Sequence, residues 1–243
     1  MDESKLASGQ VVTGFSYPQV ALYSAANGVV THTGVRDLAR GVNLNPQITV
    51  ANADNILYLN NRAAERGKPH FRTGTLGVGV DGLRVASEKM IMGIPETSTQ
   101  NVTIGDNDVV EFYTYDEDQD VPYVSLGVVV QVQSNGNVYY IAFIYTKLQF
   151  NQFDVPATTE GQEIDWQTTS LSAQILIDDT PKHAWKWFSE PLDSELKAYN
   201  ACRVALGGEA VQTLPLIGGS TSAGTSAGTG AGGESGSGTE GGV

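Results

Sequence analysis

One dipeptide near the middle of the chain constrains the fold more than any other feature. Asn135-Gly136 stands between two long runs rich in Val, Ile, Tyr and Phe, and Asn-Gly in that position is the strongest short-range signal for a two-residue hairpin loop. The predicted hairpin extends over Pro122–Phe150. Each arm measures about 35 Å at about 3.4 Å per residue, which is well beyond a usual strand.

The two-residue loop fixes the pairing of the arms and divides their side chains into two faces. One face is apolar throughout and is expected in the core. Its cross-strand pairs are Val132 with Tyr139, Val130 with Ile141, Val128 with Phe143 and Leu126 with Tyr145. The other face mixes polar and apolar residues. Its cross-strand pairs are Gln133 with Val138, Gln131 with Tyr140, Val129 with Ala142, Gly127 with Ile144 and Ser125 with Thr146. A monomer has little use for this mixed face or for a long strand edge. We therefore expect self-assembly through it, with Val129, Gln131 and Tyr140 at the subunit interface.

Composition narrows the class of protein. The chain has 243 residues, of which 40% are hydrophobic, and 28 Gly punctuate its short apolar runs, as is typical of a mainly β fold. The net charge of −13 argues against a surface that binds phosphate. No run of about 18 apolar residues is present, and the first residues do not resemble a signal peptide. We therefore expect no membrane contact and folding in a cytoplasm.

The expected organisation is one β domain between two polar ends. Residues 1–14 form an N-terminal arm, residues 15–210 the domain, and residues 211–243 a flexible Gly/Ser/Thr-rich tail. Apolar spacing and stop signals predict helices over Leu83–Met92 and Leu192–Leu206.

Two further extended segments have an uncharged polar side. In Val42–Ala51 it consists of Asn43, Asn45, Gln47 and Thr49, and in Gln162–Ile177 of Thr168, Ser170, Ser172 and Gln174. Alternation with aliphatic residues predicts strands with one face in the core. Pro46 cannot donate to a sheet ladder, so the first strand is expected to be broken, bulged or unpaired there.

Charged residues gather in two segments of opposite sign. Asn60–Gly74 contains Arg62, Arg66, Lys68 and Arg72 and is expected to be a long loop. Val109–Tyr115 is expected to be a strand that ends in the acidic turn Asp116–Asp120.

No constellation of catalytic or metal-binding residues is recognisable, and we expect neither an enzyme nor a cofactor or metal site. Gly77–Gly82 fits G-x-G-x-x-G, but no alternation of strands and helices follows it. Asp116, Asp118 and Asp120 begin like a calcium loop, but Val121 replaces the required Gly. The lone Cys202 is expected to be buried.

Several short motifs occur in a characteristic order along the chain. They are Ala53-Asp54-Asn55, Met90–Gly93, Pro122–Gly127, Phe143–Phe150, Gly161–Ile164 and Ala184–Lys186. Their order and spacing from Phe15 to Trp187 resemble those of the major tail (tube) protein of long-tailed bacteriophages, in particular the phi13-type family. The resemblance implies a β-sandwich or partial barrel with a flanking helix, and hexameric rings stacked into a hollow tube in which long hairpins close an inner barrel.

The resemblance also implies a place in the virion tail after assembly in the host cytoplasm. Its partners would be further copies of the chain, a tape measure protein and tail-end proteins, while DNA would pass through the lumen during genome ejection without specific binding. A neutral wall does not hold phosphate, so the expected lumen-lining residues are Asn43, Asn45, Gln47, Thr49, Thr168, Ser170 and Ser172. The basic residues Arg62, Arg66 and Arg72 would contact Asp116 and Asp118 of a neighbouring subunit or ring.

A carbohydrate- or surface-binding β-sandwich is the alternative. Trp166, Trp185 and Trp187 could stack on sugar rings. This hypothesis predicts monomers that a sugar stabilises.

Overall fold

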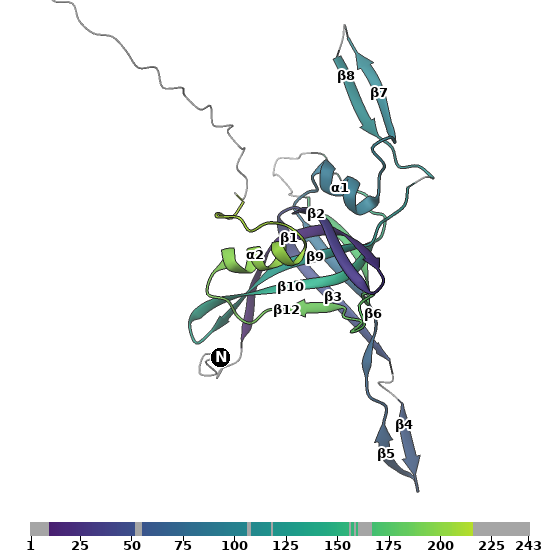
Figure 1. Ribbon diagram of the computed structural model, residues 1–243, viewed down its shortest axis with the longest axis vertical. Coiled ribbons are helices and arrows are strands. Elements are labelled where there is room, and N and C mark those ends of the chain that lie inside the picture. The colour runs from purple at the N-terminus through teal and green to yellow at the C-terminus, as the bar shows by residue number, and fades with distance from the viewer. Residues whose placement is uncertain are drawn as a thin grey trace, which may run out of the picture.

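The computed structural model describes residues 10–51, 55–105, 108–117, 119–155, 157, 159 and 167–215 (Figure 1). The strands in these residues are β1 (Val11–Ala26), β2 (Val29–Asp37), β3 (Gly41–Ala51), β4 (Ile56–Leu59), β5 (Arg62–Arg66), β6 (His70–Val80), β7 (Thr99–Ile104), β8 (Asp108–Tyr113), β9 (Val124–Ser134), β10 (Asn137–Phe150), β11 (Thr169–Leu176) and β12 (Lys186–Phe188). The helices are α1 (Val85–Met92) and α2 (Glu195–Ala205). The predicted mainly β fold with a flanking helix is confirmed.

One large antiparallel sheet forms the body of the molecule. Its strand order is β2-β1-β9-β10-β11-β6-β3, and β12 pairs with β10 next to β11. The sheet curls until its two ends approach each other. The ring of Phe15 on β1 lies so close to Gly41 on β3 that a Cβ there would overlap it, although β1 and β3 stand near opposite ends of the strand order. The body is therefore a partial barrel.

The central hairpin has the predicted register. Asn135 and Gly136 adopt φ values of 50° and 78°, as a type I′ turn requires, and the pairs from Gln133–Val138 to Leu126–Tyr145 are those expected. Beyond them a bulge shifts the register, so that Val124 pairs with Leu148. This bulge replaces the expected Ser125–Thr146 pair.

The expectation that this hairpin offers a free edge is wrong. β9 pairs with β1 on its outer side, and β10 pairs there with β11 and β12. Part of the predicted N-terminal arm supplies this cover, because Val11 and Val12 of β1 pair with Gln133 and Val132. Residues 1–9 of that arm lie outside the described residues. Among the strands described, β2 and β3 form the edges of the sheet.

The concave side of the sheet holds the main core. Fully buried side chains of β9, β10, β11 and β6 meet there, and α1 contributes Ile91 and Met92. The apolar face of the central hairpin supplies Leu126, Val128 and Tyr145, all at most 1% exposed. This part of the prediction is confirmed.

The middle of the mixed face is covered within the subunit, which corrects the sequence-based hypothesis there, whereas Gln133 and Val138 next to the turn are exposed. α2 packs on it, and Val129 is 0% exposed in a cluster with Tyr199 and Cys202. Gly127 permits the close approach, since a Cβ there would lie 2.9 Å from the Cβ of Cys202. Val129 is therefore a core residue rather than a subunit-interface residue.

α1 ends at Met92 as predicted, and α2 ends at Ala205, one residue before the predicted end. Both helices begin later than predicted, at Val85 and at Glu195. Gly93, with φ of 65°, terminates α1. After α2 the N–H of Gly207 donates to Val204 and that of Gly208 to Arg203, as in a Schellman motif.

The domain continues further than expected at its C-terminal end. The backbone of Val211 exchanges two hydrogen bonds of 2.9 Å with the side chain of Asn200, and Leu214 packs on the α2 cluster. The predicted boundary of the tail at residue 211 is therefore wrong. Residues 216–243 lie outside the described residues.

Two hairpins project from the body at opposite ends of its long axis (Figure 1). One consists of β4 and β5, joined by Asn60 and Asn61 with φ values of 49° and 61°. The other consists of β7 and β8. The long loop expected over Asn60–Gly74 is thus a hairpin followed by the first half of β6. Asn-Asn between β-formers was a turn signal that the sequence analysis missed.

Candidate assembly surfaces

The two strands with uncharged polar sides flank the same neighbour. β6 pairs with β11 on one side and with β3 on the other, so residues of the three strands form continuous rows. The rows are Ser170–Gly79–Asn43, Ser172–Gly77–Asn45, Gln174–Thr75–Gln47 and the pair Thr73–Thr49. We call these eleven residues the neutral face.

The neutral face is uncharged, and its residues on the two outer strands are mostly open to solvent. Asn43, Asn45, Gln47 and Thr49 on β3 are exposed, as are Ser170 and Ser172 on β11. Thr168 is exposed immediately before β11, so the structure brings together all seven residues predicted to line a lumen.

Gly79, in the middle strand of the neutral face, leaves room for a neighbouring side chain to lie across it. A Cβ on Gly79 would lie 2.7 Å from the side-chain nitrogen of Asn43, so the Asn43 amide lies over that glycine. Leu76, Val78 and Leu171 of the same strands point the other way, into the core, with exposures of at most 1%. The neutral face is thus the outer surface of the half of the sheet that α2 does not cover.

The free edge beside the neutral face is partly apolar. Val42 is 50% exposed and Ile48 39% exposed on β3. Pro46 does not break the strand, but lies opposite Leu76 in a strand that pairs with β6 alone among the described strands. Bulges occur instead near the two ends of β3. An edge with exposed aliphatic side chains is a surface on which another strand can pair.

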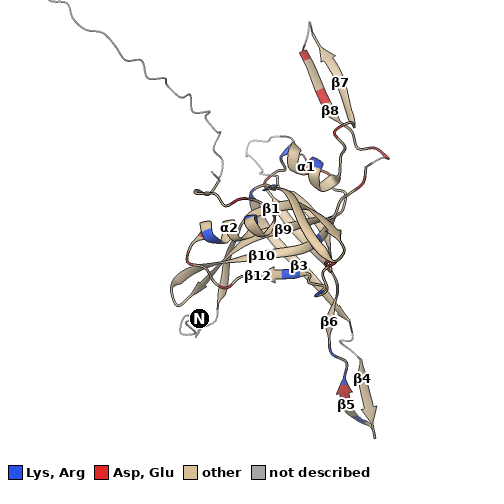
Figure 2. Ribbon diagram, in the orientation of Figure 1, with Lys and Arg blue, Asp and Glu red and all other residues tan. Residues whose placement is uncertain are grey.

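The predicted basic residues lie on one projecting arm. Arg62 and Arg66 are exposed on β5, and Arg72 is exposed on β6 where the arm joins the body (Figure 2). The predicted acidic partner Asp116 is exposed on the segment that follows β8, at the opposite end of the molecule (Figure 2). Asp118 lies outside the described residues. Among the residues described, the basic side chains of the arm and Asp116 therefore lie far apart within one chain.

The remaining predicted interface residues belong to the body. Gln131 is half-buried, and its carbonyl accepts a hydrogen bond from Thr13 of the neighbouring strand. Tyr140 is half-buried and exchanges two backbone hydrogen bonds with Leu192 at 2.8 and 2.9 Å. These bonds engage the backbone of both residues, and the side chain of Tyr140 packs partly on the α2 cluster.

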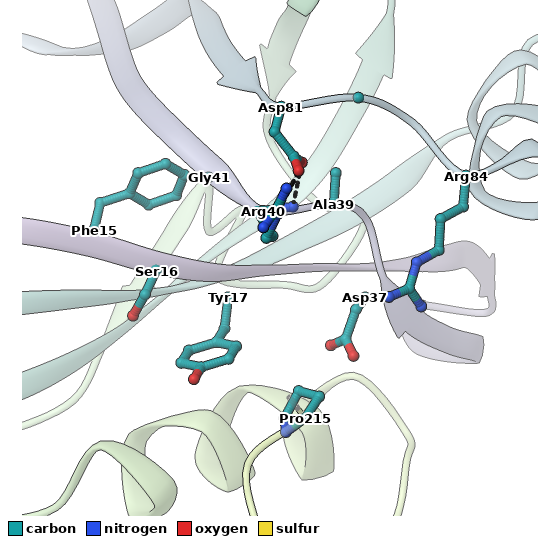
Figure 3. A pocket seen from close by; sticks show the side chains of 11 residues that line it. Phe15, Ser16, Tyr17, Asp37, Ala39, Arg40, Gly41, Asp81, Arg84 and Pro215 are labelled. Atoms are coloured by element: carbon teal, nitrogen blue, oxygen red, sulfur yellow. Dashed lines mark hydrogen bonds and ion pairs between the residues drawn. The ribbon is translucent and has the colours of Figure 1, made fainter. Parts of the chain in front are cut away.

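A pocket of about 430 Å³ lies where β1, the β2–β3 corner and the end of β6 meet (Figure 3). Its charged groups are Asp37, Arg40, Asp81 and Arg84. Arg40 forms an ion pair with Asp81, and Asp37 accepts a hydrogen bond from the Tyr199 hydroxyl at 3.0 Å. Tyr17 lines the pocket in the left-handed region, with φ of 49°. The sequence analysis missed this pocket, because its walls come from segments far apart along the chain.

Several polar groups around the pocket are engaged with one another. Besides the Arg40–Asp81 pair and the Tyr199–Asp37 hydrogen bond, the hydroxyl of Ser16 donates to the carboxylate of Glu195 at 2.7 Å. Within the described part of the chain, no group of three His, Cys, Asp or Glu residues could hold a metal ion. Over the same residues, none of the helices is long and apolar enough to span a membrane.

The single cysteine is buried, as predicted. Cys202 lies on the face of α2 that packs on the sheet. Its burial there raises the pKa of the thiol to about 12, although hydrogen bonding to the carbonyls of Val128 and Phe143 acts in the opposite direction. The thiol is therefore protonated at neutral pH and is a poor nucleophile.

The tryptophans do not form a common platform. Trp185 is half-buried and stacks on Phe71, with ring centroids 4.8 Å apart. Trp187 is 40% exposed on β12. Trp166 lies outside the described residues. A sugar site built from all three is therefore without support among the residues described.

Comparisons with known proteins add no family assignment: no family model matches the chain, and no curated protein matches it.

Proposed function

We propose that this chain is a structural subunit that assembles with further copies of itself. The observation that carries this proposal is the neutral face, which has eleven uncharged residues in a chain of net charge −13. A surface without cations offers no binding sites to phosphate, and one without anions does not repel it. Such a surface suits the wall of a passage for a polyanion.

The free edge of β3 borders the neutral face, and it provides a way to extend that face from copy to copy. Its exposed Val42 and Ile48 would be covered by a neighbouring subunit. Closing sheets into a ring removes their edges, which otherwise invite uncontrolled pairing. Copies arranged around an axis would then enclose a lumen lined by the neutral face.

More specifically, we propose that the chain is the tail-tube subunit of a long-tailed bacteriophage, as its motif order suggests. Hexameric rings would stack into a tube that conducts DNA during genome ejection. A tape measure protein would occupy the lumen before ejection, and tail-end proteins would bind the ends of the tube. The virion tail is then the site of action, after assembly in the host cytoplasm.

Negative-stain electron microscopy of the purified chain tests the assembly. We expect rings or tubes at high protein concentration. A chain that stays strictly monomeric by light scattering would contradict the proposal. If sugars also raised the melting temperature of that monomer, the carbohydrate-binding alternative would replace it.

Lysine substitutions test the placement of the neutral face. In assembled tubes, Asn45→Lys with Ser172→Lys should make the lumen retain DNA at low salt, because each cation pairs with phosphate. Val204→Lys with Gln212→Lys adds the same charge at exposed positions on the α2 side and serves as the control. Equal retention by both variants, or by neither, would contradict a lumen lined by the neutral face.

A further inference from the structure

The two projecting hairpins present uncovered apolar side chains. β4–β5 and β7–β8 are two-stranded sheets that pair with no other described strand. A lone two-stranded hairpin is marginally stable in water and gains stability when its apolar side is covered. Each hairpin therefore needs a partner surface.

The apolar side of β7–β8 follows from its register. Gln100 pairs with Phe112, Val102 with Val110, and Ile104 with Asp108, so these residues share one face. Val102, Ile104 and Phe112 are 40%, 51% and 53% exposed. The charged residues of the hairpin's two strands, Asp108 and Glu111, are acidic. At its base, Lys89 of α1 lies over the ring of Tyr113, 4.1 Å from the ring centroid.

The β4–β5 hairpin combines apolar and basic residues. On β4, the residues Leu57, Tyr58 and Leu59 are 52%, 62% and 56% exposed. β5 and the segment leading into β6 supply Arg62, Arg66 and Lys68, against a single Glu65. This tip is thus apolar along one strand and mainly cationic along the other.

We infer that copies of this chain dock head to tail, with the β4–β5 tip of one copy covering the apolar face of β7–β8 on the next. The two hairpins lie at opposite ends of the molecule, so they cannot cover each other within one chain (Figure 1). Contact between two like tips would place charges of the same sign together. The unlike pairing covers aliphatic and aromatic side chains on both partners. It brings the cationic β4–β5 tip to the face that carries Asp108, and Glu111 adds acidic charge from the other face of the same hairpin.

This contact rests on the proposed self-assembly and adds a direction to it. A heterologous contact between opposite ends leaves one unused tip of each kind, so the assembly grows along an axis. One terminus presents basic, apolar tips and the other presents acidic, apolar tips. A protein that caps the first terminus would therefore offer an acidic, apolar surface, and one that caps the second a basic, apolar surface.

Charge exchange tests the contact in the full-length chain. Arg62→Glu with Arg66→Glu should leave both tips acidic, and Asp108→Lys with Glu111→Lys should leave both tips basic. Each double variant should keep the melting temperature of the body but fail to elongate, as measured by sedimentation velocity and electron microscopy. The quadruple variant exchanges the two signs and should restore elongation. Lys182→Glu and Glu209→Lys reverse exposed charges on the body and should have no effect.

The outcomes separate this contact from the proposed function. If the wild-type chain elongates and both double variants elongate equally well, the head-to-tail contact is wrong while self-assembly stands. Failure of the quadruple variant to elongate, with its body still folded, would also overturn the contact. A wild-type chain that never assembles would overturn both.

Discussion

At the scale of single residues, a substitution of Val129 tests whether this side of the hairpin is covered by α2 or by another subunit. Val129→Asp should unfold the subunit, because an unpaired carboxylate at a fully buried position costs several kcal/mol. Thermal unfolding followed by circular dichroism measures the loss. Val138→Asp, on the same hairpin at a 42% exposed position, is the control and should change stability little. A Val129→Asp chain with wild-type stability and impaired assembly would instead support the interface hypothesis from the sequence.

At the scale of elements, the end of α1 depends on one glycine. Gly93 has φ of 65°, and a Cβ there would overlap the carbonyl oxygen of Asp120. Gly93→Ala should therefore destabilise the chain by more than about 1 kcal/mol, the usual effect of placing Ala at a positive φ. Denaturant unfolding provides the measurement.

A second glycine serves as a control that separates backbone strain from the steric overlap with Asp120. Gly105 has φ of 66°, but nothing lies within 4 Å of the Cβ it would acquire. Gly105→Ala should carry the backbone strain alone. Equal losses for the two variants would mean that α1 moves away from the acidic segment without cost.

The hairpins also differ in how extensively they pair and pack with the rest of the molecule. The central hairpin is paired on both sides and covered by α2, whereas β4–β5 and β7–β8 are held only at their bases. Hydrogen exchange of the two projecting hairpins should be faster in a single subunit than in an assembly, because local opening is easiest where few apolar contacts form.

At the scale of the whole molecule, the C-terminal segment is expected to be dispensable for assembly and to lie on the outside of the tube. In the proposed hexameric tube, six segments of 26 residues with this Gly/Ser/Thr-rich composition, each with a random-coil reach of about 28 Å, would obstruct the proposed passage for DNA. A chain that stops after Pro215 should therefore assemble as the full-length chain does. Protection of residues 218–243 from proteolysis in tubes would contradict this placement.

Truncation before residue 215 would remove part of the folded domain as well as the C-terminal segment. A chain that stops after Gly208 loses Val211 and Leu214, and with them the hydrogen bonds to Asn200 and part of the cover on the α2 cluster. This shorter chain should be less stable, so its failure to assemble would report on folding rather than on the tail.

Local sequence determined the features whose causes lie within a few residues. Asn135-Gly136 selected the turn, and the turn set the register from Gln133–Val138 to Leu126–Tyr145. Gly93 and Gly207 ended the helices because both adopt a positive φ. Alternation on β3 and β11 identified the polar residues of the neutral face, because successive side chains of a strand point to opposite sides.

Only the tertiary structure decided which surfaces meet. A period of two residues states that a face is apolar, but not whether α2 or another subunit covers it; α2 does, and this removed Val129 from the interface. The sequence likewise did not reveal that β6 joins the two uncharged strands into one face, or that the basic and acidic segments lie at opposite ends. These outcomes depend on strand partners far apart along the chain, which are chosen by the burial that the whole fold achieves rather than by any local pattern.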